Sequence, residues 1–176
     1  MSNETGRFPA FSLSPVPEPV PGVAPPELFQ GIYGMPAFVT VESADLAAST
    51  EFWTRGLGFF DFFSLPGQIV HLRRWAFQDV LLVPEREPGT AGGATGVTVS
   101  FSCVLDQVES AVKACEALRP GCTSGPAKTP WNTVDVEVRT PEGVRVIMTA
   151  ARPYDPDPDG EQARNLRAMG IEAPEA

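Results

Sequence analysis

His71, Arg73 and Trp75 recur at every second residue in an apolar stretch that begins at Ile69. Side chains two residues apart in a β-strand point to the same face of the sheet, so these residues are predicted to share one face. An imidazole can transfer protons near neutral pH, and an indole offers a flat surface for stacking. If this face lines a cleft, His71 and Arg73 are its polar anchors and the candidate catalytic groups. The alternative is a histidine with a structural role only.

The elements that would position these residues form a half-unit that occurs twice. The first copy has a strand at 37–41, a helix at 45–53 and three further apolar segments to Pro84. The second has a strand at 96–104, a helix at about 106–118 and three shorter segments that end at Ala150. This repeat predicts an α+β fold built from two βαβββ modules. Trp53 and Cys115 are expected in the core.

The two ends of the chain differ from this repeat. Seven prolines between Pro9 and Pro26 exclude a helix or an inner strand there, and interleaved apolar residues favour an arm packed along the body or across a partner subunit. We therefore expect a Pro-rich N-terminal arm at 1–34, a domain at 35–152 with modules at about 35–87 and 95–152, and a C-terminal tail at 153–176. A short helix is predicted in the tail at 161–169.

Composition restricts the possible functions. The chain has 176 residues, 43% of them hydrophobic, which suffices for one domain with a proper core. Its net charge of −9 argues against nucleic acid, whose phosphates require a basic surface, and favours a cationic ligand over an anionic one. The 3 cysteines include no close pair, so no disulfide framework is expected. Without a signal peptide or a membrane-spanning stretch, a soluble cytoplasmic protein is expected.

Three motifs, in order, resemble the vicinal oxygen chelate superfamily of glyoxalases, bleomycin-resistance proteins and extradiol dioxygenases. Residues 45–59 are similar to the "DLxxSxxFYxxLGF" first-helix signature of the bleomycin-resistance branch. Residues 70–74 look like the third strand of that branch, and residues 130–143 resemble its "PWGxxxFxVxDPxGN" stretch. The resemblance covers about 36–152. It implies that the two modules form a curved mixed sheet around a cleft, and it leaves the substrate open because this fold hosts both binders and enzymes.

The resemblance also implies where a metal would bind. In metal-dependent members, His and Glu ligands lie on the first and last strands of each module. The matching positions here hold Phe38 (or Ala37), the segment 80–83, Ser100 and Ile147, and the whole chain has 1 histidine. A divalent metal needs three or four converging N, O or S donors, so no metal and no cofactor are expected. A carboxylate site at Glu42 or Asp79 is the alternative.

A cleft without metal would be an aromatic groove, as in the bleomycin-resistance branch. The predicted ligand-binding residues are Phe38, His71, Arg73, Trp75, Ser100, Phe101, Trp131 and Ile147. The leading hypothesis is a metal-independent protein that sequesters an aromatic, antibiotic-like ligand, with a cationic ligand favoured by the acidic balance. The alternative is a metal-free cyclase or isomerase of natural-product biosynthesis, with Asp61, Asp79 or Glu137 acting beside His71 and Arg73. A homodimer is expected, because members of this family commonly pair.

Overall fold

The computed structural model describes residues 17–31, 34, 37–86, 98–155 and 157–168, and it confirms the predicted fold class. The first module consists of β1 (Val39–Ser43), α1 (Leu46–Glu51), the π-helical turn η1 (Phe52–Gly56), β2 (Phe60–Leu65), β3 (Ile69–Arg73) and β4 (Asp79–Pro84). The second consists of β5 (Thr98–Ser102), α2 (Leu105–Leu118), β6 (Thr123–Lys128), β7 (Thr133–Arg139) and β8 (Arg145–Ala151). Helix α3 (Glu161–Ala168) follows, close to the predicted tail helix.

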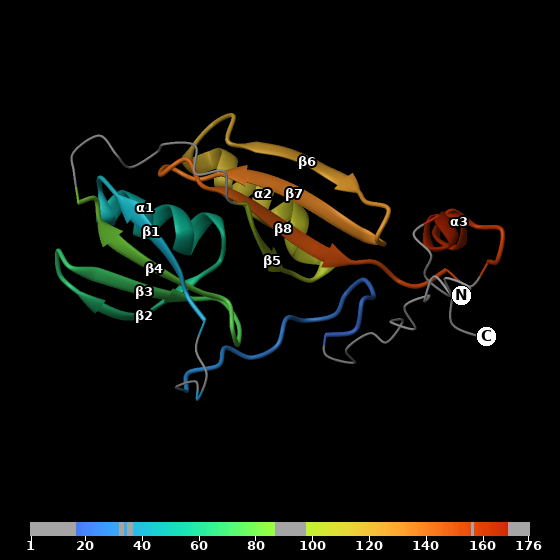
Figure 1. The fold of residues 1–176 in the computed structure, drawn as a ribbon, viewed down its shortest axis with the longest axis horizontal. Helices are drawn as coiled ribbons and strands as arrows, with labels where there is room; N and C mark the ends of the chain where they lie inside the picture. Colours follow the sequence, from blue (N-terminus) through green and yellow to red (C-terminus); the bar gives the residue numbers. More distant parts are fainter. Residues whose placement is uncertain (1–16, 32–33, 35–36, 87–97, 156, 169–176) are drawn as a thin grey trace, which may run out of the picture.

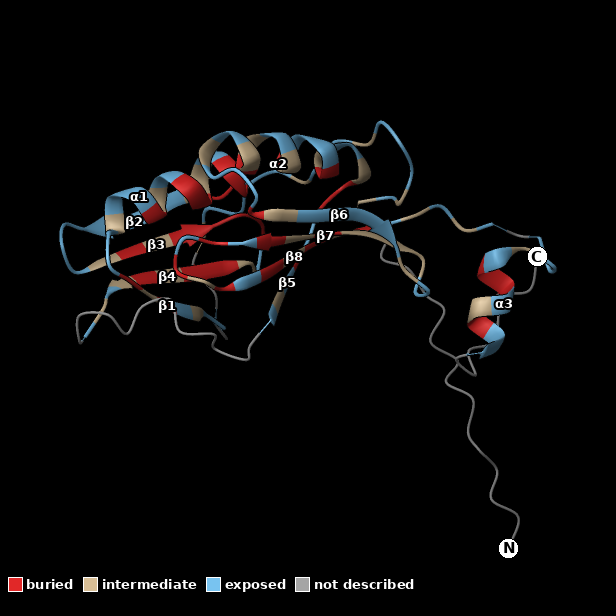
Figure 2. Cartoon of the chain, turned by 90° about the horizontal axis from the view of Figure 1, so that it is seen from above, coloured by how far each residue is buried: buried red, intermediate tan, exposed pale blue. Residues whose placement is uncertain are grey.

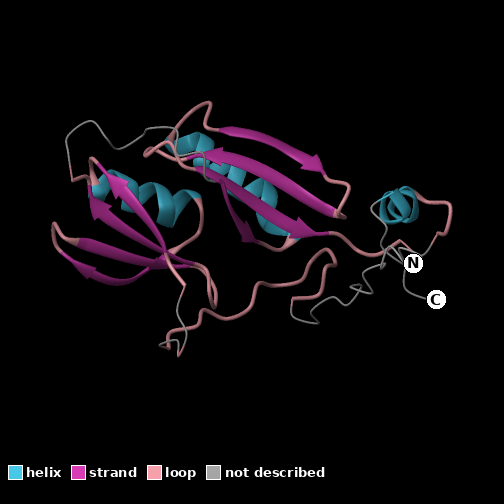
Figure 3. Cartoon of the chain, in the orientation of Figure 1, coloured by secondary structure: helices cyan, strands magenta, loops and turns pink. Residues whose placement is uncertain are grey.

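Each module folds into a mixed sheet of 4 strands, in the orders β1-β4-β3-β2 and β5-β8-β7-β6. The first strand of each module runs parallel to its last strand, and the other neighbours are antiparallel. The two sheets therefore have the same topology, as the repeat in the sequence predicts. Figures 1 and 3 show the two modules, with β1 and β5 as the strands of each sheet that face the other module.

The helices cover one face of the sheets. Helix α1 starts at Asp45, whose carboxylate accepts hydrogen bonds from the backbone N–H groups of Ala47 and Ala48 at 3.0 Å each. Alternate strand residues, such as Val80 and Leu82 of β4, are fully buried under the helices. Figure 2 shows α1 and α2 on one side, with buried residues on the strands beneath them. The opposite face of each sheet is left for polar and partly exposed side chains.

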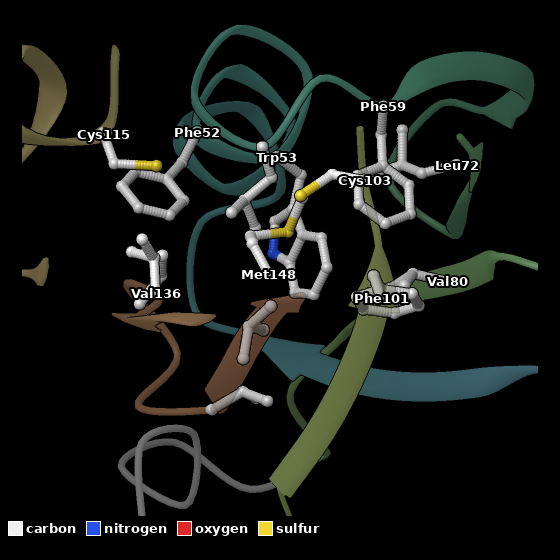
Figure 4. Close-up of a cluster of buried hydrophobic side chains, with 14 of the residues drawn as sticks. Phe52, Trp53, Phe59, Leu72, Val80, Phe101, Cys103, Cys115, Val136 and Met148 are labelled. Atoms are coloured by element: carbon white, nitrogen blue, oxygen red, sulfur yellow. The ribbon is translucent and has the colours of Figure 1, made fainter. Parts of the chain in front are cut away.

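One hydrophobic core is shared by the two modules. Trp53 is fully buried, and its ring lies edge-on to Phe59 at 5.2 Å and to Phe101 at 6.3 Å between ring centroids. Cys115 and Met148 belong to the same cluster (Figure 4). The indole N–H of Trp53 also donates to the buried Glu142 carboxylate at 3.3 Å. The expected core positions of Trp53 and Cys115 are confirmed.

The described part of the N-terminal arm lies along the body of the same chain. The backbone N–H of Gly22 donates to Asp106 Oδ2 at 3.0 Å, at the start of α2. From there the segment runs past the second module toward the first sheet (Figure 1). Residues 1–16 of the predicted arm lie outside the described residues. In the described part of the chain, no helix combines the length and the apolar character needed to cross a bilayer.

Candidate functional site

Asp79 joins the two polar residues that the sequence singled out. His71 Nε2 lies 2.6 Å from Asp79 Oδ1, and Arg73 Nε donates to the same oxygen at 2.7 Å. Asp79 begins β4 and pairs with Arg73 of β3, so the hairpin brings these side chains together on the face away from the helices. The Asp79 side chain is completely buried, and its Oδ2 has no hydrogen-bond partner in the described part of the chain. The site thus contains a buried carboxylate that orients both an imidazole and a guanidinium.

Aromatic rings surround this polar cluster. The His71 ring lies edge-on to Phe38 at 5.3 Å and to Phe62 at 5.0 Å. The guanidinium carbon of Arg73 lies over the Phe62 ring at 4.1 Å from the centroid. The β2 strand has a bulge between Asp61 and Phe63. Phe62 of this bulged segment contacts the polar cluster, while Phe63 is exposed.

A pocket of about 410 Å³ lies between β1 and β5, next to this cluster. It is lined by residues of both modules and of the β3–β4 turn, namely Ala37, Phe38, Val39, Ala76, Phe77, Gln78, Asp79, Val99, Ser100, Phe101 and Ser102. Phe77 in that turn is 67% exposed and has a φ of 63°, a left-handed conformation that is rare for a non-glycine residue. Exposed rings at Phe38 and Phe77 therefore border a cavity of ligand size.

The predicted residues of the second module divide between the two faces of its sheet. Ser100 is exposed and pairs with the half-buried Ile147 in the β5–β8 register, so both lie on the face away from the helices. Phe101 points the other way, into the core against Phe59 and Trp53 (Figure 4), although the residue also borders the pocket. A one-residue step along a strand reverses the side-chain direction, which explains this difference.

The two predicted tryptophans lie apart from this pocket. Trp75 is buried, with the Arg74 guanidinium over its ring at 4.9 Å. Burial lowers the pKa of Arg74, whose side chain donates to the Leu57 carbonyl at 3.1 Å and to Gln107 at 2.8 Å. This arrangement ties the β3–β4 turn to both helices.

Trp131 is 65% exposed and lines a second pocket, of about 140 Å³, beside α3. Asn132 next to it has a φ of 63°, and its amide donates to the Arg152 carbonyl at 3.0 Å. Gln162 of α3 donates to the Asn132 side chain, and this contact fixes the helix against the β6–β7 turn. Trp131 is thus available for stacking, at a place that does not include His71 or Arg73.

The other two acidic candidates are separate from His71. Asp61 is exposed and accepts a hydrogen bond from Ser64 Oγ at 2.6 Å. Glu137 lies on β7 and forms ion pairs with Arg145 at 2.7 Å and Arg139 at 3.5 Å. Of the three carboxylates that the sequence left open, Asp79 is the one that reaches the histidine.

The residues at the expected ligand positions do not fit a metal centre. Phe38 and Ile147 carry no donor atom, Ser100 offers a neutral hydroxyl, and the Val80–Val83 segment of β4 is aliphatic. Among the described residues, no group of three or more His, Cys, Asp or Glu side chains is placed to hold an ion. Asp79 is instead committed to His71 and Arg73. That the protein works without metal stays a prediction.

Sequence reasoning missed the contribution of the arm to the site. For Phe62, alternation in the aromatic run at 59–63 predicts that one aromatic pair faces the cleft, while the bulge between Asp61 and Phe63 was not predicted. Phe29 and Gly31 of the arm enter through their backbone carbonyls, which accept hydrogen bonds from Arg73 Nη1 at 2.9 and 2.6 Å. The apolar residues between the arm prolines were the available signal, since they favoured an arm that packs.

This arrangement of two βαβββ modules is the vicinal oxygen chelate fold. Solved structures that include glyoxalase-like and bleomycin-binding proteins share this fold. An integron cassette protein from the mobile metagenome of the Halifax Harbour sewage outfall is 24% identical with a TM-score of 0.50, over 67% of this chain and 99% of that one. A lactoylglutathione lyase from Agrobacterium tumefaciens is 20% identical with a TM-score of 0.50, over 67% and 94%.

The bleomycin-binding protein of the bleomycin producer Streptomyces verticillus, complexed with copper(II)-bleomycin, is 19% identical with a TM-score of 0.51, over 69% of this chain and 100% of that one. Scans against protein-family models and curated proteins gave no match. At these identities the likeness establishes the fold and leaves the ligand to be argued from the site.

Proposed function

We propose that this protein is a metal-independent binder that sequesters an aromatic small molecule in the cleft beside β1 and β5. The observation that carries the proposal is the pocket of about 410 Å³ that Phe38, Phe77 and Ser100 border next to the buried His71–Asp79–Arg73 cluster. Pockets of this size that combine aromatic rings with placed polar groups are typical of small-molecule sites.

Binding would be stoichiometric, with no bond made or broken. Exposed aromatic rings supply flat stacking surfaces at little cost in side-chain entropy, and contacts with the buried Asp79 carboxylate hold His71 and Arg73 in fixed orientations. A neighbour of the same fold, the S. verticillus protein, was solved with copper(II)-bleomycin, which makes an antibiotic a reasonable first ligand class. The net charge of −9 would attract a cationic compound.

The proposal is tested by isothermal titration calorimetry of the wild-type protein against flat aromatic antibiotics, bleomycin among them, with and without EDTA. We expect saturable binding with a stoichiometry near one compound per site. The binding should persist in EDTA, and the compound should be recovered chemically unaltered. Loss of binding with EDTA would contradict metal independence. The absence of saturable binding across the panel would contradict the proposal itself.

A second candidate is a metal-free enzyme, and the His71–Asp79 contact favours it. An ionised carboxylate only accepts hydrogen bonds, so Asp79 selects the tautomer in which His71 Nε2 carries the proton. The lone pair then lies on Nδ1, which has no hydrogen-bond partner in the described part of the chain. A carboxylate-oriented imidazole is suited to act as a general base. A new product, detected by mass spectrometry and absent with His71→Gln, would establish this alternative.

Pairing of two chains is also part of the proposal. Phe63 and Leu65 are 52% and 43% exposed on β2, which is an edge strand of the first sheet. Exposed apolar residues on an edge strand favour association. Sedimentation equilibrium would test this, with a monomer at all concentrations as the contrary result.

A further inference from the structure

The arm segment Phe29–Gly31 contacts Arg73 as a bound ligand would. Arg73 Nη1 donates to the Phe29 carbonyl at 2.9 Å and to the Gly31 carbonyl at 2.6 Å. The Arg73 guanidinium carbon also lies over the Phe29 ring, at 5.6 Å from the centroid. The segment thus offers one aromatic ring and two oxygen acceptors to a single guanidinium.

These contacts bury the cation. The Arg73 side chain is only 2% exposed, although it sits on the sheet face that the helices leave open. Its Nε is engaged by Asp79, and the Phe62 ring lies against its guanidinium on the sheet itself. The arm adds further contacts from 42 and 44 residues away in sequence.

We propose that Arg73, which lies beside the pocket next to Asp79, determines the specificity of the cleft, and that Phe29–Gly31 takes the place of a ligand group on this guanidinium, so that a ligand extending from the pocket to Arg73 must displace it. This inference rests on the proposed function, because it assigns the ligand class and the regulation of that site. The ligand would carry an aromatic ring and adjacent oxygen acceptors, such as amide carbonyls or a carboxylate. Asp79 neutralises Arg73, so a ligand with a positive charge elsewhere is still accommodated.

A tethered occupant lowers the apparent affinity for every competitor. The observed dissociation constant equals the intrinsic constant divided by the fraction of molecules whose site is open. A short tether holds its segment at an effective concentration in the millimolar range, so even a weak contact keeps the site mostly closed. An arm docked in about nine of ten molecules would weaken ligand binding about tenfold.

Two glycines of the arm offer a matched pair of variants in the full chain. A Cβ added at Gly31 would lie 2.6 Å from the tip of the Phe29 ring, so in Gly31→Ala that ring must shift from its present position. A Cβ added at Gly34 would meet nothing within 4 Å, so Gly34→Ala is the control. Phe29→Ala removes the ring directly and is the second test variant.

The first measurement is modification of Arg73 by phenylglyoxal, quantified by mass spectrometry. We expect Arg73 to be protected in the wild type and in Gly34→Ala, and to react at least about tenfold faster in Gly31→Ala and Phe29→Ala. Arg86, whose side chain is 88% exposed, should react alike in all four proteins and serves as the internal standard. Equal Arg73 rates in the four proteins would overturn the proposal.

The second measurement uses an acetylated, amidated peptide with the sequence of residues 24–31. We expect this peptide to restore Arg73 protection in Gly31→Ala, whereas the same peptide with Phe29→Ala should not. Failure of the wild-type peptide to protect Arg73 would show that the arm is no ligand-like occupant and would also overturn the proposal.

The two proposals fail in different ways. If the cleft binds aromatic compounds but wild type and Gly31→Ala bind them equally, the arm proposal is wrong and the proposed function stands. If no compound of the panel binds to either protein while Arg73 labelling follows the arm, the proposed function is the one contradicted. An increase in affinity of about tenfold in Gly31→Ala supports both.

Discussion

Arg73 and Asp79 face each other across the β3–β4 hairpin, and the guanidinium donates to the carboxylate at 2.7 Å with both side chains removed from water. Burying two charges costs several kcal/mol of desolvation, which the mutual attraction offsets only when the geometry is good. A protein that needed only a stable hairpin would be served as well by two apolar residues. The pair therefore suggests a role for Arg73 beyond stability. The arm carbonyls that accept hydrogen bonds from Arg73 Nη1 mark the place where a ligand group would bind.

Asp79→Asn should destabilise the protein by about 3 kcal/mol, because it leaves the buried Arg73 without a counter-charge. Urea unfolding followed by circular dichroism measures this change. Asp61→Asn is the matched control, since Asp61 is exposed and bonds only to Ser64 among the contacts described. Equal midpoints for the two variants would mean that the ion pair adds nothing to stability.

Phe38→Ala should weaken binding of an aromatic ligand about tenfold, since loss of a stacking ring removes about 1 kcal/mol or more. Phe63→Ala removes a similarly exposed ring, 52% against 44%, outside the pocket. Calorimetric titration of both variants with the same compound separates the two sites. If Phe63→Ala lost as much affinity as Phe38→Ala, the ligand would not lie between β1 and β5.

The cysteines should be unreactive in the native protein. Cys103, Cys115 and Cys122 are free and buried. Burial raises the pKa of Cys103 to about 11 and that of Cys115 to about 12, so almost no thiolate exists at pH 8. Ellman's reagent should react slowly until a denaturant is added and should then titrate all three thiols. A fast reaction of one thiol in the native protein would show that the structure around that cysteine opens.

Glu116 should contribute to the acid sensitivity of the fold. Hydrogen bonds from the Thr123 hydroxyl, and then from the backbone N–H groups of Gly121 and Thr123, lower the pKa of Glu116 below its ordinary value of 4.5. A depressed folded-state pKa gives stability that is complete above 4.5 and is lost as pH falls through the folded-state pKa. The stability difference between wild type and Glu116→Gln should therefore shrink from pH 7 toward pH 3.

Glu109→Gln on the same helix is the control for this titration. Glu109 is exposed and pairs only with Lys113, at 3.8 Å, among the ion pairs described. Melting temperatures of both variants across the pH series should diverge near neutral pH. Parallel curves of melting temperature against pH for the two variants would mean that Glu116 does not contribute to the acid sensitivity of the fold.

The fold was predictable because its signals are local. The apolar spacing of Trp53 and Cys115 follows from neighbours along the chain, and the structure places both in the core as expected. The face shared by His71 and Arg73 likewise follows from strand alternation. Two copies of the same pattern then fixed the architecture.

The site was predictable only in part, because its remaining contacts depend on register and on distant segments. Asp79 reaches His71 through the pairing of β3 with β4, which strand patterns do not specify to the residue. Phe62 depends on a bulge, and Trp131 lies in a separate pocket where α3 packs against its turn. The predicted roles of Phe38, Ser100, Ile147 and the other site residues in ligand contact remain predictions.

The shared core has a practical meaning for finding the ligand. Because Trp53, Phe59 and Phe101 join both modules in one cluster, the halves are expected to melt together, and a compound wedged between β1 and β5 would hold both. Ligand present at a hundred times its dissociation constant adds about 2.7 kcal/mol to such a single transition. The melting temperature therefore reports on occupancy of the cleft. Unlabelled compound libraries or cell extracts can be screened by the rise in melting temperature that a bound ligand causes.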